Sequence, residues 1–165
     1  MSSQPAHHVA QLNIGRLRAP VDSELVAPFM DALDEINALA DGWPGFVWRF
    51  QTEDGNATAE RPFDDESILV NFSTWESIEA LGDYVYRSDH TAFLRRRREW
   101  FEKMDEVVTV LWWVPAGHQP DVDEAIDRLE ALRRDGPTPY AFTFRHRFDP
   151  DGQPVASRRR DTCPG

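Results

Sequence analysis

Cysteine is almost absent from this chain of 165 residues, which carries only Cys163, close to its C-terminal end. A single thiol cannot form an internal disulfide bond or a thiolate metal cluster. The His, Asp and Glu residues show no spacing typical of a metal site. A glycine-rich phosphate loop, a serine nucleophile elbow and a Walker motif are also missing. These absences disfavour the common metal, P-loop and hydrolase classes, and we expect no bound metal.

Basic residues are outnumbered, with 18 Lys and Arg against 29 Asp and Glu and a formal net charge of -11. Phosphate backbones require basic surface, so this balance disfavours nucleic acid as a partner. Residues 1–8 contain no apolar core of a signal peptide, and no apolar run approaches the roughly 18 residues of a membrane span. The sequence therefore predicts a cytoplasmic protein with no nucleic-acid or membrane partner.

The hydrophobic content is ordinary, at 41% with six tryptophans, and predicts one globular domain with a single substantial core. We expect this domain to span residues 8–147. Residues 1–7 are polar and are predicted to be disordered. Residues 148–165 hold few apolar side chains and are predicted to form a flexible tail.

The first half of the chain alternates between strand and helix patterns. Residues 8–17 alternate in polarity and predict a strand. A helix is expected from Asp22, with an apolar stripe, and Gly42 and Pro44 end it. Residues 45–52 predict a second strand with Phe46, Trp48 and Phe50 on one face, and residues 53–66 a long hairpin loop. The stripe of the helix comprises Phe29, Leu33, Ile36, Leu39 and Ala40.

The stretch from residue 66 to 101 is the one around which the rest is organised. It opens as a strand in which Ile68, Val70 and Phe72 face one way and Leu69, Asn71 and Ser73 the other. Ser73 and Glu76 then resemble a capping box, which predicts that a helix begins at this point. Its apolar positions are Trp75, Ile78, Leu81 and Val85. A polar amide at the carboxyl end of a strand, four residues before an indole, is a common place for a small-molecule pocket.

The second half repeats these patterns. Residues 90–102 predict another helical piece, and residues 106–115 an almost continuous apolar strand, which must be covered on both faces. Residues 121–136 predict the clearest helix, with acidic residues in its first turn and Arg133 and Arg134 in its last. Residues 137–148 predict a last strand with Tyr140, Phe142 and Phe144 on one face.

This order of elements predicts an α+β fold, the ferredoxin-like βαββαβ arrangement, plus a C-terminal helix and strand. Its antiparallel sheet would carry helices on one face. The strand that contains Trp112 and Trp113 is apolar on both sides, so the second face needs a cover as well. A second copy of the chain would supply it, and we therefore expect a homodimer closed sheet to sheet.

Two resemblances support this fold. Trp75-Glu76-Ser77, Glu79-Ala80 and the later His90 are similar to the signature of the dimeric α/β-barrel superfamily typified by antibiotic-biosynthesis monooxygenases. The chain from His8 to Arg145 also resembles a bacterial family labelled as a domain of unknown function. That second likeness includes AQLNIGRLRAP, PGFVWRFQTEDG, DYVYRS, RRREWF, LWWVPAGH and PTPYAFTF.

The superfamily resemblance implies two kinds of chemistry. Its cofactor-independent monooxygenases of aromatic polyketide and secondary metabolism hold a substrate enolate with an Asn and a Trp four residues apart, and a later Arg. Asn71 and Trp75 match that pair, and Arg95 follows. Haem-degrading members use an Asn on the first strand, matched by Asn13, and a His nine residues after the Trp. Tyr84 stands there, so His90 would have to replace that ligand.

The candidate catalytic residues are therefore Asn71, Trp75, His90 and Tyr86, and each has a structural alternative. Asn71, with Ser73, could be a satisfied polar pair within the sheet. Trp75 could be a core residue, and His90 a helix cap. Tyr84 and Tyr86 cannot both face inward, and we expect Tyr86 to supply the pocket hydroxyl.

The candidate substrate-binding residues are Asn13, Arg49, Ser73, Trp112 and Arg95. Arg49 lies among apolar residues, so it either pairs with an acid or meets an anionic ligand. Arg95 belongs to an arginine run that is typical of a solvated helix face. Trp112 would form a pocket wall beside Trp75.

Two functions remain open from the sequence. The first is an enzyme that acts on an aromatic or enolisable substrate by oxygenation or proton transfer, without a cofactor and with His90 as acid and base. The second is a stress-response or binding protein that holds haem or another hydrophobic small molecule without turnover.

Overall fold

The fold was obtained as a computed structural model, and it describes residues 6–19, 23–50, 68–87, 97–103 and 106–155. The predicted loop 53–66 and most of the predicted helical piece 90–102 lie outside these ranges. Within them, no helix is long and apolar enough to cross a membrane.

One long strand, β1 (His7–Leu17), forms the centre of an antiparallel sheet. On one side it pairs with β3 (Ile68–Trp75), which pairs in turn with β2 (Phe46–Arg49). On its other side it pairs with β5 (Thr109–Pro115) along its first half and with β4 (Phe101–Glu102) at its end. The order β2-β3-β1-β5 is that of the predicted ferredoxin-like sheet, which the structure confirms.

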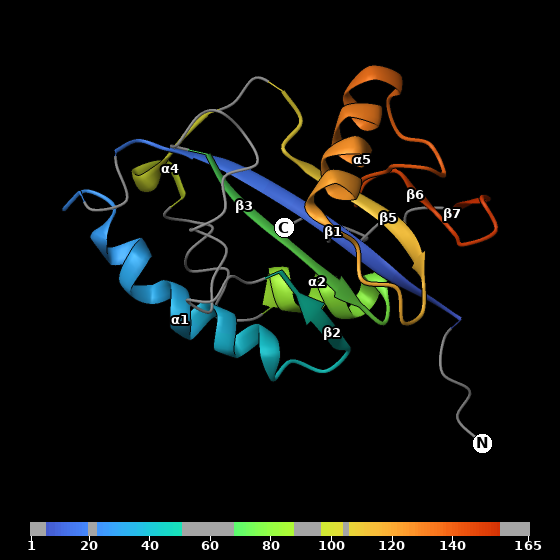
Figure 1. Cartoon of the computed structure of the whole chain (residues 1–165), viewed down its shortest axis with the longest axis horizontal. Coiled ribbons are helices and arrows are strands. Elements are labelled where there is room, and N and C mark those ends of the chain that lie inside the picture. The colour runs from blue at the N-terminus through green and yellow to red at the C-terminus, as the bar shows by residue number, and fades with distance from the viewer. Residues whose placement is uncertain (1–5, 20–22, 51–67, 88–96, 104–105, 156–165) are drawn as a thin grey trace, which may run out of the picture.

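Helices lie on both faces of this sheet. Helix α1 (Ala27–Asp41) and helix α2 (Ile78–Arg87) pack toward β2 and β3. Helix α5 (Val122–Asp135) crosses β1 and β5, as Figure 1 shows. A short helix, α4 (Arg97–Trp100), precedes β4.

The alternation of β1 separates two apolar cores. Ala10, Leu12 and Ile14 belong to a core packed against α5, whose helical members include Leu129 and Leu132. Val9 belongs to a core packed against α1 and α2. Because neighbouring residues of a strand point to opposite faces, one strand serves both cores. We call these faces the α5 face and the α1/α2 face.

Part of the second face is thus covered by the chain's own helix. The sequence had suggested a second copy as the cover, but α5 occupies this place over β1 and β5. The homodimer stays a sequence-based prediction, and its original reason is weakened.

Several boundaries differ from the expectation. Helix α1 begins at Ala27, with Pro28 in its first turn, and not at the expected Asp22. Strand β3 continues to Trp75, so Ser73 is a strand residue and not a helix cap. The cap of α2 is instead Ser77, whose Oγ accepts from the backbone N–H of Ala80 at 3.0 Å. The expected helix over residues 90–102 is also wrong at its end, because Phe101–Glu102 pair with β1 as a strand.

The side-chain pattern of β2 was also wrong. A register shift between Phe46 and Trp48 interrupts its alternation. Phe46 packs against Trp75 on the α1/α2 face, whereas Trp48 packs against Phe72 on the α5 face. A bulge adds a residue to one strand and thereby moves the following side chains to the other face.

The expected last strand, residues 137–148, is not formed as a continuous element. Residues here make only isolated bridges, between Leu111 and Phe142 and between Thr138 and Ala141. Tyr140 is exposed while Phe142 is fully buried. Proline cannot donate to a strand ladder, and Pro137 and Pro139 explain the break. The end of the predicted strand does form β6 (Arg147–Phe148), which pairs with β7 (Pro154–Val155) from the region predicted to be a tail.

Candidate functional site

A row of uncharged polar side chains crosses the middle of the sheet. In the register of β3, β1 and β5, Asn71 is opposite Asn13 and Asn13 is opposite Thr109. One step along, Ser73 is opposite Gln11. Directly opposed residues of antiparallel strands point to the same face, so these five side chains share one surface, which we call the polar row.

The polar row lies between two apolar clusters on the α1/α2 face. At one end, Val9, Trp75 and Leu111 pack with Ala40 of α1 and with α2. At the other end Leu17 packs near Leu69, with Phe29 and Met30 of α1 among the partly buried neighbours. The two ends of α1 therefore reach both clusters, and the polar side chains interrupt the apolar contact between them.

Hydrogen bonds hold four members of the row in place. Ser73 Oγ accepts from Gln11 Nε2 at 3.0 Å and from the indole N–H of Trp75 at 2.9 Å. Asn13 Nδ2 donates to Thr109 Oγ1 at 2.7 Å. A hydroxyl oxygen has two lone pairs, so Ser73 has used its acceptor capacity and keeps its own proton to donate. The satisfied-pair alternative thus holds for Ser73.

Asn71 is different, because it is exposed while Val70 and Phe72 on either side are buried. Within the described part of the chain, its amide has no side-chain hydrogen-bond partner. An amide offers two donors and an acceptor. Asn71 is therefore the member of the polar row whose amide is exposed, and none of the five side chains carries a charge.

Trp75 is a core residue. It is 1% exposed, and its ring stacks on Tyr84 at 5.1 Å and meets the edge of Phe46 at 5.3 Å. Its only polar hydrogen is engaged by Ser73. Trp75 thus holds Ser73 of the polar row in place through this hydrogen bond and does not present its indole N–H to a ligand.

Tyr84 is the tyrosine of α2 that packs inward. Its hydroxyl donates to the carbonyl oxygen of Ile36 at 3.2 Å. Burial, helped by the nearby Asp41 carboxylate and opposed by Arg49, raises its pKa to about 12. The phenol is therefore neutral and engaged at physiological pH, which does not suit an iron ligand. The side chain of Tyr86 is not among those that the structure describes, so its role as a pocket hydroxyl stays a prediction.

Arg49 forms an ion pair with Asp41. Its Nε lies 2.7 Å from Asp41 Oδ1, and its second bond, from Nη2 to Oδ2, is 3.3 Å long. This bidentate contact joins β2 to the last residue of α1. Of the two alternatives for Arg49, the structure shows the acid pair.

Trp112 lies on the α5 face, whereas the polar row lies on the α1/α2 face. The indole N–H of Trp112 donates to Glu124 Oε2 at 3.1 Å. The structure therefore does not bring it together with Asn71 or Trp75. His90 and Arg95 lie outside the described residues, so their roles stay predictions. Among the described residues, no group of three or more His, Cys, Asp or Glu side chains is placed to hold a metal ion.

Two residues of the polar row, Gln11 and Thr109, were not among the predicted site residues. The alternation of the first strand places Gln11 beside Asn13 on one face, and that signal could have found it. Thr109 stands within an apolar run, and only the register of β1 and β5 reveals that it meets Asn13. That pairing cannot be read from one strand alone.

Residues 8–158 match the family described as Domain of unknown function (DUF3291). Among functionally curated proteins, none matches this chain.

Three solved structures are similar over most of their own lengths. A protein of unknown function from Nitrosomonas europaea has a TM-score of 0.46 at 12% identity and covers 71% of this chain and 98% of its own. A conserved protein from Methanosarcina mazei has a TM-score of 0.45 at 16% identity and covers 68% of this chain and 95% of its own. SnoaB, a cofactor-independent oxygenase from Streptomyces nogalater, has a TM-score of 0.45 at 16% identity and covers 70% of this chain and 100% of its own. At such scores and identities, the likenesses carry no functional argument.

Proposed function

This chain belongs to the family described as Domain of unknown function (DUF3291), and we propose that it is an enzyme acting on a small aromatic or enolisable molecule. The reaction would be oxygenation or proton transfer at a carbon next to an oxygen-bearing group, without an organic or metal cofactor.

The observation that carries this proposal is the exposed amide of Asn71 at the β3 end of the polar row. An amide N–H aimed at a substrate oxygen stabilises the negative charge that develops when a neighbouring C–H proton is removed. The hydrogen bonds of Gln11, Asn13 and Ser73 hold the side chains beside Asn71 in place, so the polar surface next to its amide is ordered before a substrate arrives.

The apolar clusters beside the row favour an aromatic substrate. Leu69 flanks the polar side chains at one end and is only partly buried, so it leaves apolar surface beside the row. A flat molecule that places its ring on this surface and its oxygen on the polar row would satisfy both kinds of contact. The resemblance of Asn71 and Trp75 to the monooxygenase pair points the same way.

The oxygenation balances without a bound cofactor. Loss of one proton from a CH₂ group gives the enolate, which transfers an electron to dioxygen and then forms a C–O bond to give a hydroperoxide. Loss of the second C–H proton, with cleavage of the O–O bond, releases water and leaves a carbonyl group. No base is found among the five residues of the polar row, and His90 remains the proposed acid and base.

The haem-binding alternative gains no support from the described residues. Tyr84, at the position where the resemblance places the iron ligand, donates its hydroxyl to Ile36 and is buried. This residue does not fit a haem site, and the alternative depends on His90 alone.

Oxygen uptake with an anthrone-type phenol tests the proposal. We expect Asn71→Ala to reduce the rate by about 10²-fold, because one oxyanion donor contributes roughly that much. Gln153→Ala is a matched control, since it removes an exposed amide from the β6–β7 turn. Thermal unfolding of both variants should match that of the parent, because neither amide side chain is buried. An unchanged rate in Asn71→Ala would remove this residue from the site and end the proposal.

A further inference from the structure

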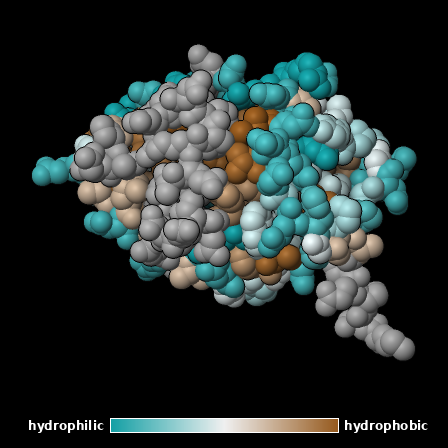
Figure 2. Space-filling model, viewed as in Figure 1, coloured by the Kyte–Doolittle hydropathy of each residue, from teal (hydrophilic) through white to brown (hydrophobic). Residues whose placement is uncertain are grey.

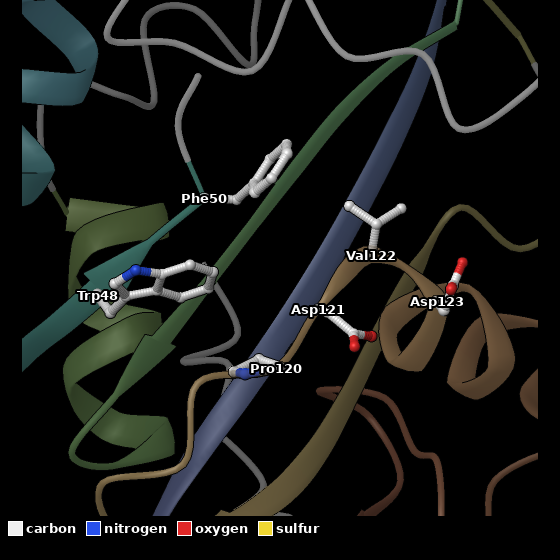
Figure 3. Close-up of a pocket in the computed structure, with 6 residues that line it drawn as sticks. All are labelled: Trp48, Phe50, Pro120, Asp121, Val122 and Asp123. Carbon is white, nitrogen blue, oxygen red and sulfur yellow. The ribbon is translucent and has the colours of Figure 1, made fainter. Parts of the chain in front are cut away.

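A hollow of about 390 Å³ opens on the other face of the sheet, away from the polar row. It lies between β2 and the start of α5, and Figure 3 shows the residues that line it. The space-filling view shows apolar atoms reaching the surface beside α5 (Figure 2). The lining residues are Trp48, Phe50, Pro120, Asp121, Val122 and Asp123. We call this hollow the α5 groove.

One wall of the α5 groove is aromatic and held in place from below. Phe50 stacks on Phe72 with ring centroids 4.6 Å apart, and Trp48 meets the edge of the same ring at 5.4 Å. Phe72 is itself 1% exposed, so the rings of Trp48 and Phe50 pack on a side chain that is fixed in the core. Both Trp48 and Phe50 are only partly buried, which leaves ring surface for a ligand.

The opposite wall carries two carboxylates. Asp121 and Asp123 are both exposed. Asp121 Oδ1 accepts the N–H of Glu124 at 2.8 Å and caps α5. The positive end of a helix amounts to about half a unit charge, so two carboxylates leave the wall negative. None of the six lining residues is basic.

Aromatic faces and carboxylates together attract a cation that has apolar substituents. We infer that the α5 groove binds a small organic ammonium ion, with its alkyl groups against Trp48 and Phe50 and its charge toward Asp121, the carboxylate nearer the two rings in Figure 3. The volume lies near the lower end for small-molecule pockets, roughly 300 to 1,000 Å³, so the ligand is small. The net charge of -11 also favours the approach of cations.

A second copy of the chain is a poorer occupant. In a two-fold symmetric contact the same surface patch meets itself, so Asp121 and Asp123 would approach their own copies. Like charges at close range oppose such an interface. Charge complementarity therefore favours the ammonium ion.

Choline and its uncharged carbon isostere 3,3-dimethylbutan-1-ol are a matched pair of probes. We expect choline to bind more tightly, to shift the indole N–H resonance of Trp48, and to lose affinity as salt is added. Trp48→Leu should weaken choline binding by roughly three- to fivefold, the range for exposed cation–π contacts. Asp121→Asn should also weaken it, because it removes the nearer negative charge while asparagine still caps α5. Glu130→Gln is the control, because it removes an equal charge from the same helix outside the groove.

Equal binding of the two probes, or choline affinity unchanged in Asp121→Asn, would overturn the ammonium site. So would a dimer, measured by light scattering, that dissociates in Trp48→Leu, because the second copy would then occupy the groove. The polar row lies on the opposite face, so oxygen uptake is expected to persist in both groove variants. The two proposals therefore fail independently.

Discussion

At the scale of single residues, the α1/α2 face depends on how each polar group is satisfied. Ser73 is buried, and its oxygen serves the indole N–H of Trp75 and the amide of Gln11 together. Without it, a buried indole N–H would lose its partner, at a cost of about 1 to 3 kcal/mol. Asn71, two residues earlier in the strand, does not hold another side chain in this way. A buried structural hydroxyl and an exposed amide thus lie two positions apart on one strand.

Tyr84 gives a pH dependence at the same scale. Its pKa is raised from 10.0 to about 12 on folding, so the folded state retains the proton where the unfolded state loses it. The stabilisation is fully present below pH 10 and is lost as the pH rises through 12. We expect the free energy of unfolding to fall by about 1.4 kcal/mol between pH 8 and pH 11 from this residue. Urea unfolding at both pH values measures it.

Tyr84→Phe should remove this portion of the alkaline loss. Tyr140→Phe separates it from the other described tyrosine, whose pKa is raised by its hydrogen bond to Asp127 and not mainly by burial. If Tyr84→Phe loses stability with pH as the parent does, Tyr84 is not the titrating group.

At the scale of elements, the pattern of the sequence decides where strands and helices lie, and local hydrogen bonds decide where they end. Trp75 has helical spacing to Ile78 and yet completes β3, because the ladder with Val9 and Phe46 extends to it. Sheet pairing therefore outweighed the capping-box pattern at Ser73. The helix begins three residues later, at the first residue after the hydroxyl of Ser77.

The cap at Ser77 is the corresponding prediction. Ser77→Ala should lower the free energy of unfolding by about 1 kcal/mol, since the N–H of Ala80 loses its acceptor. Ser77→Asp should retain the stability of the parent, because aspartate caps equally well and its charge suits the helix start. Chemical denaturation of the three proteins measures the order. Equal losses in the alanine and aspartate variants would contradict a capping role.

At the scale of the whole molecule, the sequence predicted the fold class and sheet order from its periodicities. It also predicted α5, whose observed span of Val122–Asp135 lies within the predicted residues 121–136. It could not predict which face α5 covers, because a helix pattern defines an apolar stripe and not its partner. For the same reason Trp112 was placed beside Trp75, although the two lie on opposite faces. The bulge in β2 left no signal in the alternation of Phe46, Trp48 and Phe50.

The core under α5 can be tested by one truncation. Leu129→Ala should destabilise the protein by about 2 to 5 kcal/mol, because Leu129 is 1% exposed between the helix and the sheet. Leu25→Ala is the matched control, since Leu25 is 53% exposed and its truncation leaves no cavity. Thermal unfolding of the two variants measures the contrast. Similar melting temperatures would show that α5 does not cover this face in solution.

Strand β1 is synthesised before the strands that it pairs with, and these are far away in the chain. The contact from Gln11 to Ser73 spans 62 residues, and that from Asn13 to Thr109 spans 96. The nascent strand therefore waits, with both edges unpaired, until β3 and β5 have emerged from the ribosome. Such long loop closures slow folding and expose the edges to other chains meanwhile. The yield of native protein should thus depend on translation speed and chaperone supply more than on final stability.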